Sequence, residues 1–132
     1  YLATQGVALL AGVPLYMGLL TGKIKAATQF DAQDARSGWP LGSPQFGALL
    51  GKVEAVREVL TNGGRTMAQG ALAWLWARHP ITIPVPGFRT AAQVKNSIEA
   101  LKLKPFTETE QRQLRELLGV MNNAQTKKAT GR

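Results

Sequence analysis

Two short apolar runs that lie far apart in the chain limit the fold more than any other feature. Residues 7–11 read Val-Ala-Leu-Leu-Ala without a polar side chain, and residues 81–85 form a short run rich in β-branched residues. Unbroken apolar runs of this length are typical of strands buried on both faces of a parallel sheet. We therefore expect two strands, joined by a long connection that carries helices.

Apolar residues recur at helical spacing between the two strands. The first repeat runs over residues 46–60 and stops at an Asn-Gly-Gly triplet. The second covers residues 66–79 and begins at Thr66, whose hydroxyl is suited to cap the helix while Gln69 reaches back to the backbone. Because this second helix is apolar on nearly all sides, we expect it to be wedged between other elements.

The same capping pattern appears twice more after the second strand. Thr90 is followed by Gln93, and Thr107 by Glu110, which predicts two further helices that begin at these threonines. Residues 119–132 are mostly Asn, Gln, Thr, Lys and Ala, so we expect a polar, disordered tail.

The order of the expected elements is strand, long loop, helix, helix, strand, helix, helix. This order places residues 1–118 in the α/β class with parallel strands. Two strands are too few to cover four largely apolar helices. We therefore expect an incomplete part of a larger sheet or barrel, or a chain that associates with itself through its unpaired strands.

The charge balance of the chain is strongly basic, with 16 Lys and Arg against 8 Asp and Glu and a net charge of +8. Such a surplus attracts phosphates, nucleic acids or acidic surfaces. The basic residues are scattered rather than gathered into stripes with interleaved aromatic residues, so the pattern argues against a nucleic-acid partner. The absence of cysteine excludes disulfides and thiolate metal sites and favours a cytoplasmic location.

Residues 1–22 carry no charge, which raises the alternatives of a signal peptide or a membrane span. Gln5, Gly12 and Pro14 interrupt the stretch, and no Met or basic segment precedes it. A strand followed by a glycine-rich turn explains these residues better, so we expect no membrane partner. The start at Tyr1 also suggests a chain that begins partway through a longer protein.

The turn over residues 84–90 has the composition of an anion site. Gly87 allows a ligand to approach the backbone, and the helix that begins after Thr90 points its first N–H groups outward. Arg89 adds a planar fork suited to a phosphate. The alternative is an ordinary strand–helix turn with a solvated arginine.

A second candidate segment, residues 13–23, follows the first strand directly. Its glycines permit close backbone approach, and Lys23 is long enough to reach a pyrophosphate. Taken alone this pattern is weak, because glycine-rich turns with a lysine are common. Both segments, however, lie at the carboxyl ends of strands, which is where parallel α/β folds bind ligands.

Three motifs together resemble the C-terminal third of an aldo-keto reductase. Residues 14–23 read Pro-Leu-x-x-Gly-Leu-Leu-Thr-Gly-Lys, residues 71–75 read Ala-Leu-Ala-Trp-Leu, and residues 83–93 read Ile-Pro-Val-Pro-Gly-Phe-Arg-Thr-x-x-Gln. The resemblance covers residues 6–118. It implies a (β/α)8 TIM barrel to which this chain contributes the seventh and eighth strands. It also implies an NADP-dependent oxidoreductase that transfers hydride between NADPH and a small carbonyl substrate in the complete enzyme.

The resemblance also implies a set of cofactor-binding residues. The positions that match the family's cofactor contacts are Pro14, Leu15, Gly18, Lys23, Arg36, Gly87, Phe88, Arg89, Gln93, Asn96 and Ser97.

Each segment has an implied role. Residues 14–23 match the family's wrap around the nicotinamide ribose and pyrophosphate, and Arg36 matches a loop residue that closes over the pyrophosphate. Residues 87–89 match the positions that hold the adenosine 2′-phosphate, and Gln93 matches the side of the adenine pocket. Arg89 predicts NADP rather than NAD.

The chain departs from the family pattern at a few of these positions. Val13 stands where the family commonly has Ser, and Asn96-Ser97 stand where it has Glu-Asn. A hydroxyl contact and part of the adenine clamp are therefore altered.

No catalytic or metal-binding residue is expected in this chain. The family's Asp, Tyr, Lys and His tetrad lies on earlier strands, and Tyr16 and His79 do not replace it, because one lies in the cofactor loop and the other ends a helix. Trp39, in the long loop, is a candidate wall of a substrate pocket. We expect a cofactor-binding part that is inactive alone; the alternative is a non-catalytic nucleotide-binding or oligomerising module.

Overall fold

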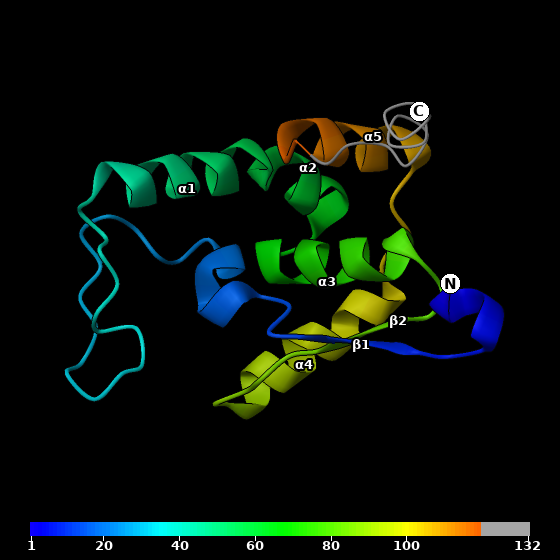
Figure 1. Ribbon diagram of the computed structural model, residues 1–132, viewed down its shortest axis with the longest axis horizontal. Coiled ribbons are helices and arrows are strands. Elements are labelled where there is room, and N and C mark those ends of the chain that lie inside the picture. Colours follow the sequence, from blue (N-terminus) through cyan, green and yellow to red (C-terminus); the bar gives the residue numbers. More distant parts are fainter. Residues whose placement is uncertain (120–132) are drawn as a thin grey trace, which may run out of the picture.

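The computed structural model describes residues 1–119 and shows two parallel strands packed against helices (Figure 1). The strands are β1 (Leu9–Gly12) and β2 (Thr82–Val85), and the α-helices are α1 (Pro44–Ala55), α2 (Arg57–Thr61), α3 (Met67–Arg78), α4 (Ala91–Glu99) and α5 (Glu108–Leu117). The 3-10 helices are η1 (Leu2–Gln5), η2 (Tyr16–Thr21), η3 (Asn62–Gly64) and η4 (Ala100–Lys102). Of the predicted tail, all but Gly119 lies outside the described residues.

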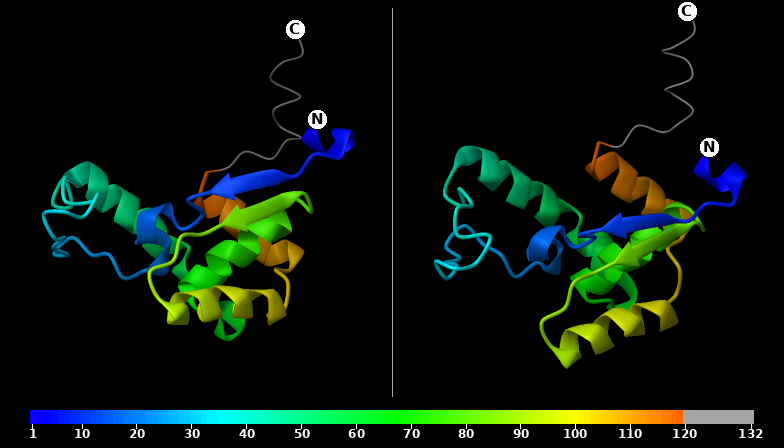
Figure 2. Two further views of the ribbon diagram at one scale, coloured as in Figure 1. Left: turned by 90° about the horizontal axis from the view of Figure 1, so that it is seen from below. Right: turned by 60° about the horizontal axis from the view of Figure 1, so that its bottom comes forward.

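The two strands pair directly and in parallel, with Leu10 opposite Ile83 and Gly12 opposite Val85. The first strand begins and ends slightly later than predicted, at Leu9 and Gly12. Helices α3 and α4 lie on one side of this sheet, and the other side is uncovered (Figure 2). Only β2 has a buried face, whereas β1 is exposed or partly exposed along its whole length.

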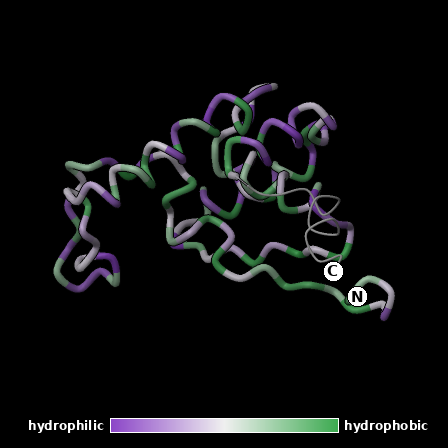
Figure 3. Tube along the Cα trace, turned by 45° about the horizontal axis from the view of Figure 1, so that its top comes forward, coloured by the Kyte–Doolittle hydropathy of each residue, from purple (hydrophilic) through white to green (hydrophobic). Residues whose placement is uncertain are grey.

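Burial of the strands differs from the prediction that both faces are covered. Thr82 and Pro84 are buried on the side of α3, whereas Leu10, Ile83 and Val85 are 66%, 48% and 50% exposed. Figure 3 shows the hydrophobic colour of the chain along β1. The reason is physical: among the described residues the sheet has only these two strands, and no helix packs on its second face.

The predicted helix over residues 46–60 is two helices. α1 begins earlier than expected, because Ser43 caps it and Pro44 occupies its first turn. The helix is interrupted at Val56, which is buried, and α2 then carries Leu60 against α3. A Cβ atom added to Gly70 of α3 would lie 2.1 Å from the Leu60 carbonyl oxygen. The two helices therefore touch through their backbones, a contact that apolar spacing cannot indicate.

The other predicted helix starts are present where the sequence places them. Complete capping boxes join Thr66 with Gln69 and Thr107 with Glu110. At α4 the Thr90 hydroxyl accepts the N–H of Gln93, but the Gln93 side chain accepts the N–H of Arg89 instead of that of Thr90. α3 is buried over its first half and partly buried over its second, in agreement with a helix wedged between neighbours.

The core lies between α1, α2, α3 and α5. Its buried members are Leu19, Ile24, Phe46, Val53, Val56, Leu60, Met67, Phe106 and Leu114. Leu19 and Ile24 come from the segment after β1, so the core holds η2 in place at the end of the strand. Within residues 1–119, no helix is both long and apolar enough to cross a bilayer.

Candidate cofactor-binding site

The two predicted ligand segments leave the sheet side by side. Gly12 and Val85 are register partners at the carboxyl ends of the parallel strands, so the turns that follow them start from the same edge. The first turn leads into η2 and the second into the amino end of α4. This is the edge at which parallel α/β sheets present ligand-binding turns.

The turn after β1 holds an unusual concentration of backbone strain. Val13, Tyr16 and Met17 have φ angles of 49°, 46° and 51°, in the left-handed region that residues other than glycine seldom adopt. Pro14 is buried and Leu15 is partly buried, which holds the turn against the body of the protein. Strained residues of this kind collect at ligand sites, where the surrounding packing enforces them.

The end of η2 is fixed by contacts to α2 and α3. Gly22 closes η2 with a φ of 72°, and a Cβ there would lie 2.8 Å from both Arg57 Nη1 and Met67 Sδ. Gly18, inside η2, has a φ of 95° and lies close to Arg36. Lys23 follows with an exposed side chain. The turn thus presents an exposed ammonium group directly after a fixed glycine cap.

The turn after β2 is open to solvent. Gly87 has no atom within 4 Å of the place where a Cβ would lie, and Phe88 is 44% exposed. The Arg89 side chain is 76% exposed, while its backbone N–H donates to Gln93 Oε1 at 2.7 Å. An exposed guanidinium beside the amino end of α4 is an arrangement suited to an anion.

The two residues predicted to border the adenine, Asn96 and Ser97, lie further along α4. The Asn96 side chain lies 3.3 Å from the Thr66 hydroxyl, and its backbone carbonyl accepts a hydrogen bond from Gln69 Nε2 at 3.0 Å. Ser97 is 8% exposed. Asn96 therefore takes part in the α3–α4 contact, and Ser97 is buried.

Asp34 joins the long loop to both turns, a role that sequence reasoning missed. Its carboxylate accepts hydrogen bonds from Arg36 Nε at 2.8 Å and Nη2 at 2.7 Å, and from Arg89 Nη2 at 3.4 Å. Arg36 in turn donates from Nη1 to the Met17 carbonyl at 3.0 Å and stacks on the Phe30 ring. The Asp-x-Arg spacing was the available signal, since an aspartate readily accepts the N–H two residues on.

Two carboxyl groups have pKa values below their usual range. Hydrogen bonds from the Arg36 side chain and backbone hold the pKa of Asp34 well below normal. Burial by itself would raise the pKa of Glu110, but hydrogen bonds from Thr107, Asn62 and Arg65 outweigh it and lower that pKa to about 2. Glu110 lies in the first turn of α5, where its carboxylate accepts hydrogen bonds from Asn62 and Arg65. Residues 1–119 contain no group of three or more His, Cys, Asp or Glu side chains that could hold a metal ion.

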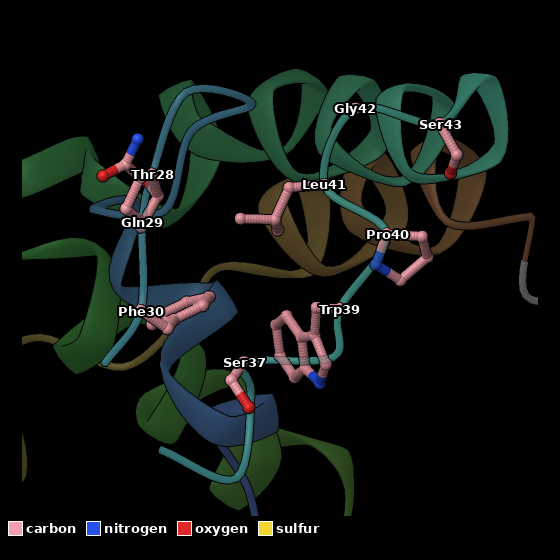
Figure 4. A pocket seen from close by; sticks show the side chains of 9 residues that line it. All are labelled: Thr28, Gln29, Phe30, Ser37, Trp39, Pro40, Leu41, Gly42 and Ser43. Atoms are coloured by element: carbon pink, nitrogen blue, oxygen red, sulfur yellow. The ribbon is translucent and has the colours of Figure 1, made fainter. Parts of the chain in front are cut away.

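Trp39 lies in an aromatic cluster beside a cavity of about 540 Å³. Figure 4 shows Phe30, Trp39 and Leu41 around this space, which is bordered by polar residues of the same long loop. The Trp39 ring lies 6.0 Å from Phe30 and 5.6 Å from Phe46. The placement is compatible with the predicted pocket wall. His79, by contrast, ends α3, and its Nδ1 accepts the Ile81 N–H at 3.4 Å.

Comparison with known proteins decides the family. The chain matches the family described as "Aldo/keto reductase family" over residues 1–118. The chain belongs to the aldo/keto reductases. It is 31% identical over 113 residues to aldo-keto reductase str7 from Strobilurus tenacellus, an alignment that covers 85% of this chain and 33% of that protein. It is 29% identical to aldo-keto reductase yakc [NADP(+)] from Schizosaccharomyces pombe, covering 76% of this chain and 30% of that protein.

A solved aldo/keto reductase shares the fold of this chain. The glycerol dehydrogenase AKR11B4 from Gluconobacter oxydans superposes with a TM-score of 0.76 and 26% identity, and the match covers 90% of this chain and 36% of that one. The chain thus spans about a third of the length of these relatives. The predicted fold class, part of a (β/α)8 barrel with two parallel strands, is confirmed.

Proposed function

We propose that this chain is the cofactor-binding part of an NADP-dependent aldo/keto reductase. In the complete enzyme, NADPH supplies hydride to a small carbonyl substrate, and the residues of this chain bind and orient the cofactor. The observation that carries the proposal is the adjacency of two ligand-type turns at one sheet edge, after Gly12 and after Val85. The NADP(+) in the name of the Schizosaccharomyces pombe relative supports the same assignment.

The turn after β2 suits the adenosine end of the cofactor. A 2′-phosphate needs an exposed cationic group, and Arg89 supplies one. It also needs open space beside the backbone, which Gly87 leaves free. The helix dipole of α4 adds to the attraction of the arginine. Gln93 then lies one helical turn further on, and we propose that it borders the adenine together with Asn96 and Ser97.

The turn after β1 suits the pyrophosphate and nicotinamide ribose. Gly18 gives the backbone freedom to approach a ligand, and the exposed Lys23 offers a cation. Pro14 and Leu15 hold the strained turn against the protein body, so its shape is set before a ligand arrives. In our proposal Arg36 lies at the rim of this turn, where the loop passes over the pyrophosphate.

Catalysis is assigned to the part of the barrel that this chain does not supply. The described residues leave the apolar side chains of Leu10, Ile83 and Val85 open on one face of the sheet. Further strands of a closed barrel would cover that face. We therefore propose that the isolated chain is inactive and that the complete enzyme adds the proton donor. The lack of cysteine supports a cytoplasmic location.

The unpaired edges of β1 and β2 support a second candidate function. A chain with exposed strand edges can pair with its own copies, so a non-catalytic nucleotide-binding module that oligomerises would also satisfy the structure. Analytical ultracentrifugation with and without NADPH separates the two readings. The enzyme-part reading expects no defined oligomer, whereas the module reading expects a discrete dimer or larger species that retains nucleotide.

Titration with NADPH and NADH, followed by cofactor fluorescence, tests the proposed site. We expect Arg89→Ala to lower the affinity for NADPH by about tenfold or more, the range for a hydrogen bond between charged groups. The affinity for NADH should stay nearly unchanged. Lys102→Ala, which removes an exposed charge in η4, beyond the carboxyl end of α4, is the matched control. Equal losses for both cofactors, or an equal loss in the control, would contradict the proposed 2′-phosphate site.

A further inference from the structure

The carboxylate of Asp34 faces two arginines that come from distant parts of the chain. Arg36 lies in the same loop, whereas Arg89 follows β2. The Asp34 side chain is 11% exposed, so it is shielded from water although it lies in a loop. The two arginine contacts therefore fix the orientation of the Asp34 carboxylate.

The contact between Asp34 and Arg36 is the tighter of the two. Arg36 donates to the carboxylate from Nε and Nη2 at 2.8 and 2.7 Å, in the two-point geometry that arginine and carboxylate groups prefer. Its remaining Nη1 donates to the carbonyl of Met17, one of the strained residues after β1. Asp34 is therefore anchored, through Arg36, to the turn proposed to hold the pyrophosphate.

The contact between Asp34 and Arg89 is of another kind. It is a single hydrogen bond of 3.4 Å, and the Arg89 side chain is 76% exposed. Most of the five N–H donors of the guanidinium thus remain available to a ligand. The contact turns Arg89 toward the first turn without saturating it.

We infer that Asp34 is a positioning residue for NADP selectivity: anchored by Arg36 to the turn after β1, it holds the Arg89 guanidinium across the site where the 2′-phosphate binds. This inference rests on the proposed function. It places the specificity of the cofactor site in a long-loop residue that is distant in sequence from both binding turns.

The same contact has two other possible effects on cofactor binding. If the Asp34 carboxylate competes with the phosphate for Arg89, removing its charge strengthens NADPH binding. A purely structural aspartate gives a third outcome, in which both cofactors weaken together because the loop loosens. The three cases differ in the ratio of NADPH to NADH affinity.

A double-mutant cycle on the chain separates these cases. We expect Asp34→Asn to lower the ratio of NADPH to NADH affinity by about two- to fivefold, the range for a charge contact with one exposed partner. In the Arg89→Ala background the same change should leave this affinity ratio unchanged. Asp31→Asn is the matched control, because Asp31 lies in the same loop and accepts the Gln33 N–H but contacts neither arginine.

The outcomes distinguish this inference from the proposed function. A tighter NADPH complex in Asp34→Asn, or equal weakening of both cofactors, overturns the positioning role. A selectivity change that persists in the Arg89→Ala background overturns it as well. If Arg89→Ala itself leaves the NADPH to NADH ratio unchanged, the proposed 2′-phosphate site fails, whatever Asp34 does.

Discussion

The contact between α2 and α3 predicts that alanine destabilises the protein at Gly70 but stabilises it at Gly51, another helical glycine. Gly70 lies inside α3, and a Cβ there would lie 2.1 Å from the Leu60 oxygen and 2.8 Å from the Leu60 carbonyl carbon. Even a close C–H···O contact is about 3.3 Å long, so Gly70→Ala forces the two helices apart by roughly 1 Å. Both clashing atoms belong to backbone, so no side chain can rotate away.

The expected free-energy change combines two effects. Overpacking a tight contact costs about 1–3 kcal/mol, and a backbone contact belongs at the upper end of that range. Alanine gains about 1 kcal/mol over glycine from helix propensity. We therefore expect Gly70→Ala to lower the free energy of unfolding by about 2 kcal/mol. Gly51 of α1 has nothing within 4 Å of its Cβ position, so Gly51→Ala should raise stability by about 0.5–1 kcal/mol.

Urea unfolding followed by far-UV circular dichroism measures both variants. The comparison uses the midpoint at an unchanged slope, so that a change in the denatured state is not read as stability. A Gly70→Ala chain that is as stable as wild type, or as Gly51→Ala, would refute the close α2–α3 contact. Since α3 supports both β2 and η2, the same loss should reduce cofactor binding.

Two further changes test the electrostatics and the backbone strain. The pKa of Glu110 is lowered from 4.5 to about 2, so its stabilising contribution is complete above pH 4.5 and is lost as the pH falls toward 2. Glu110→Gln should therefore flatten the curve of unfolding free energy against pH in this range. Parallel curves for Glu110→Gln and wild type would contradict this prediction. Met17→Gly should raise the free energy of unfolding by about 1 kcal/mol, because Met17 has a φ of 51°; a loss of stability in urea unfolding would argue against the strained turn.

Local features of the sequence could predict much of the fold. The helix starts at Thr66, Thr90 and Thr107 depend on hydrogen bonds between neighbours in the chain, and each is present. The strands and their parallel pairing follow from apolar runs and from the helices between them. Predictions that depend on short-range chemistry therefore agree with the structure.

Features that depend on distant contacts could not be predicted in this way. The break at Val56 leaves the apolar spacing of α1 and α2 uninterrupted, so the pattern indicates one helix. Burial of β1 depends on strands that the described chain does not contain, and Leu10 is exposed for that reason. Asp34 reaches Arg89 only because the long loop folds back on the turn after β2.

The central claim is that the turns after β1 and β2 form one NADP site. Changes in backbone amide chemical shifts on adding NADPH or NADH test this claim most directly. We predict that NADPH and NADH both shift the amides of residues 18–23, whereas only NADPH strongly shifts those of residues 87–93. Shifts confined to one turn would contradict a shared site. Equal shifts at Arg89 with both cofactors would contradict its contact with the 2′-phosphate.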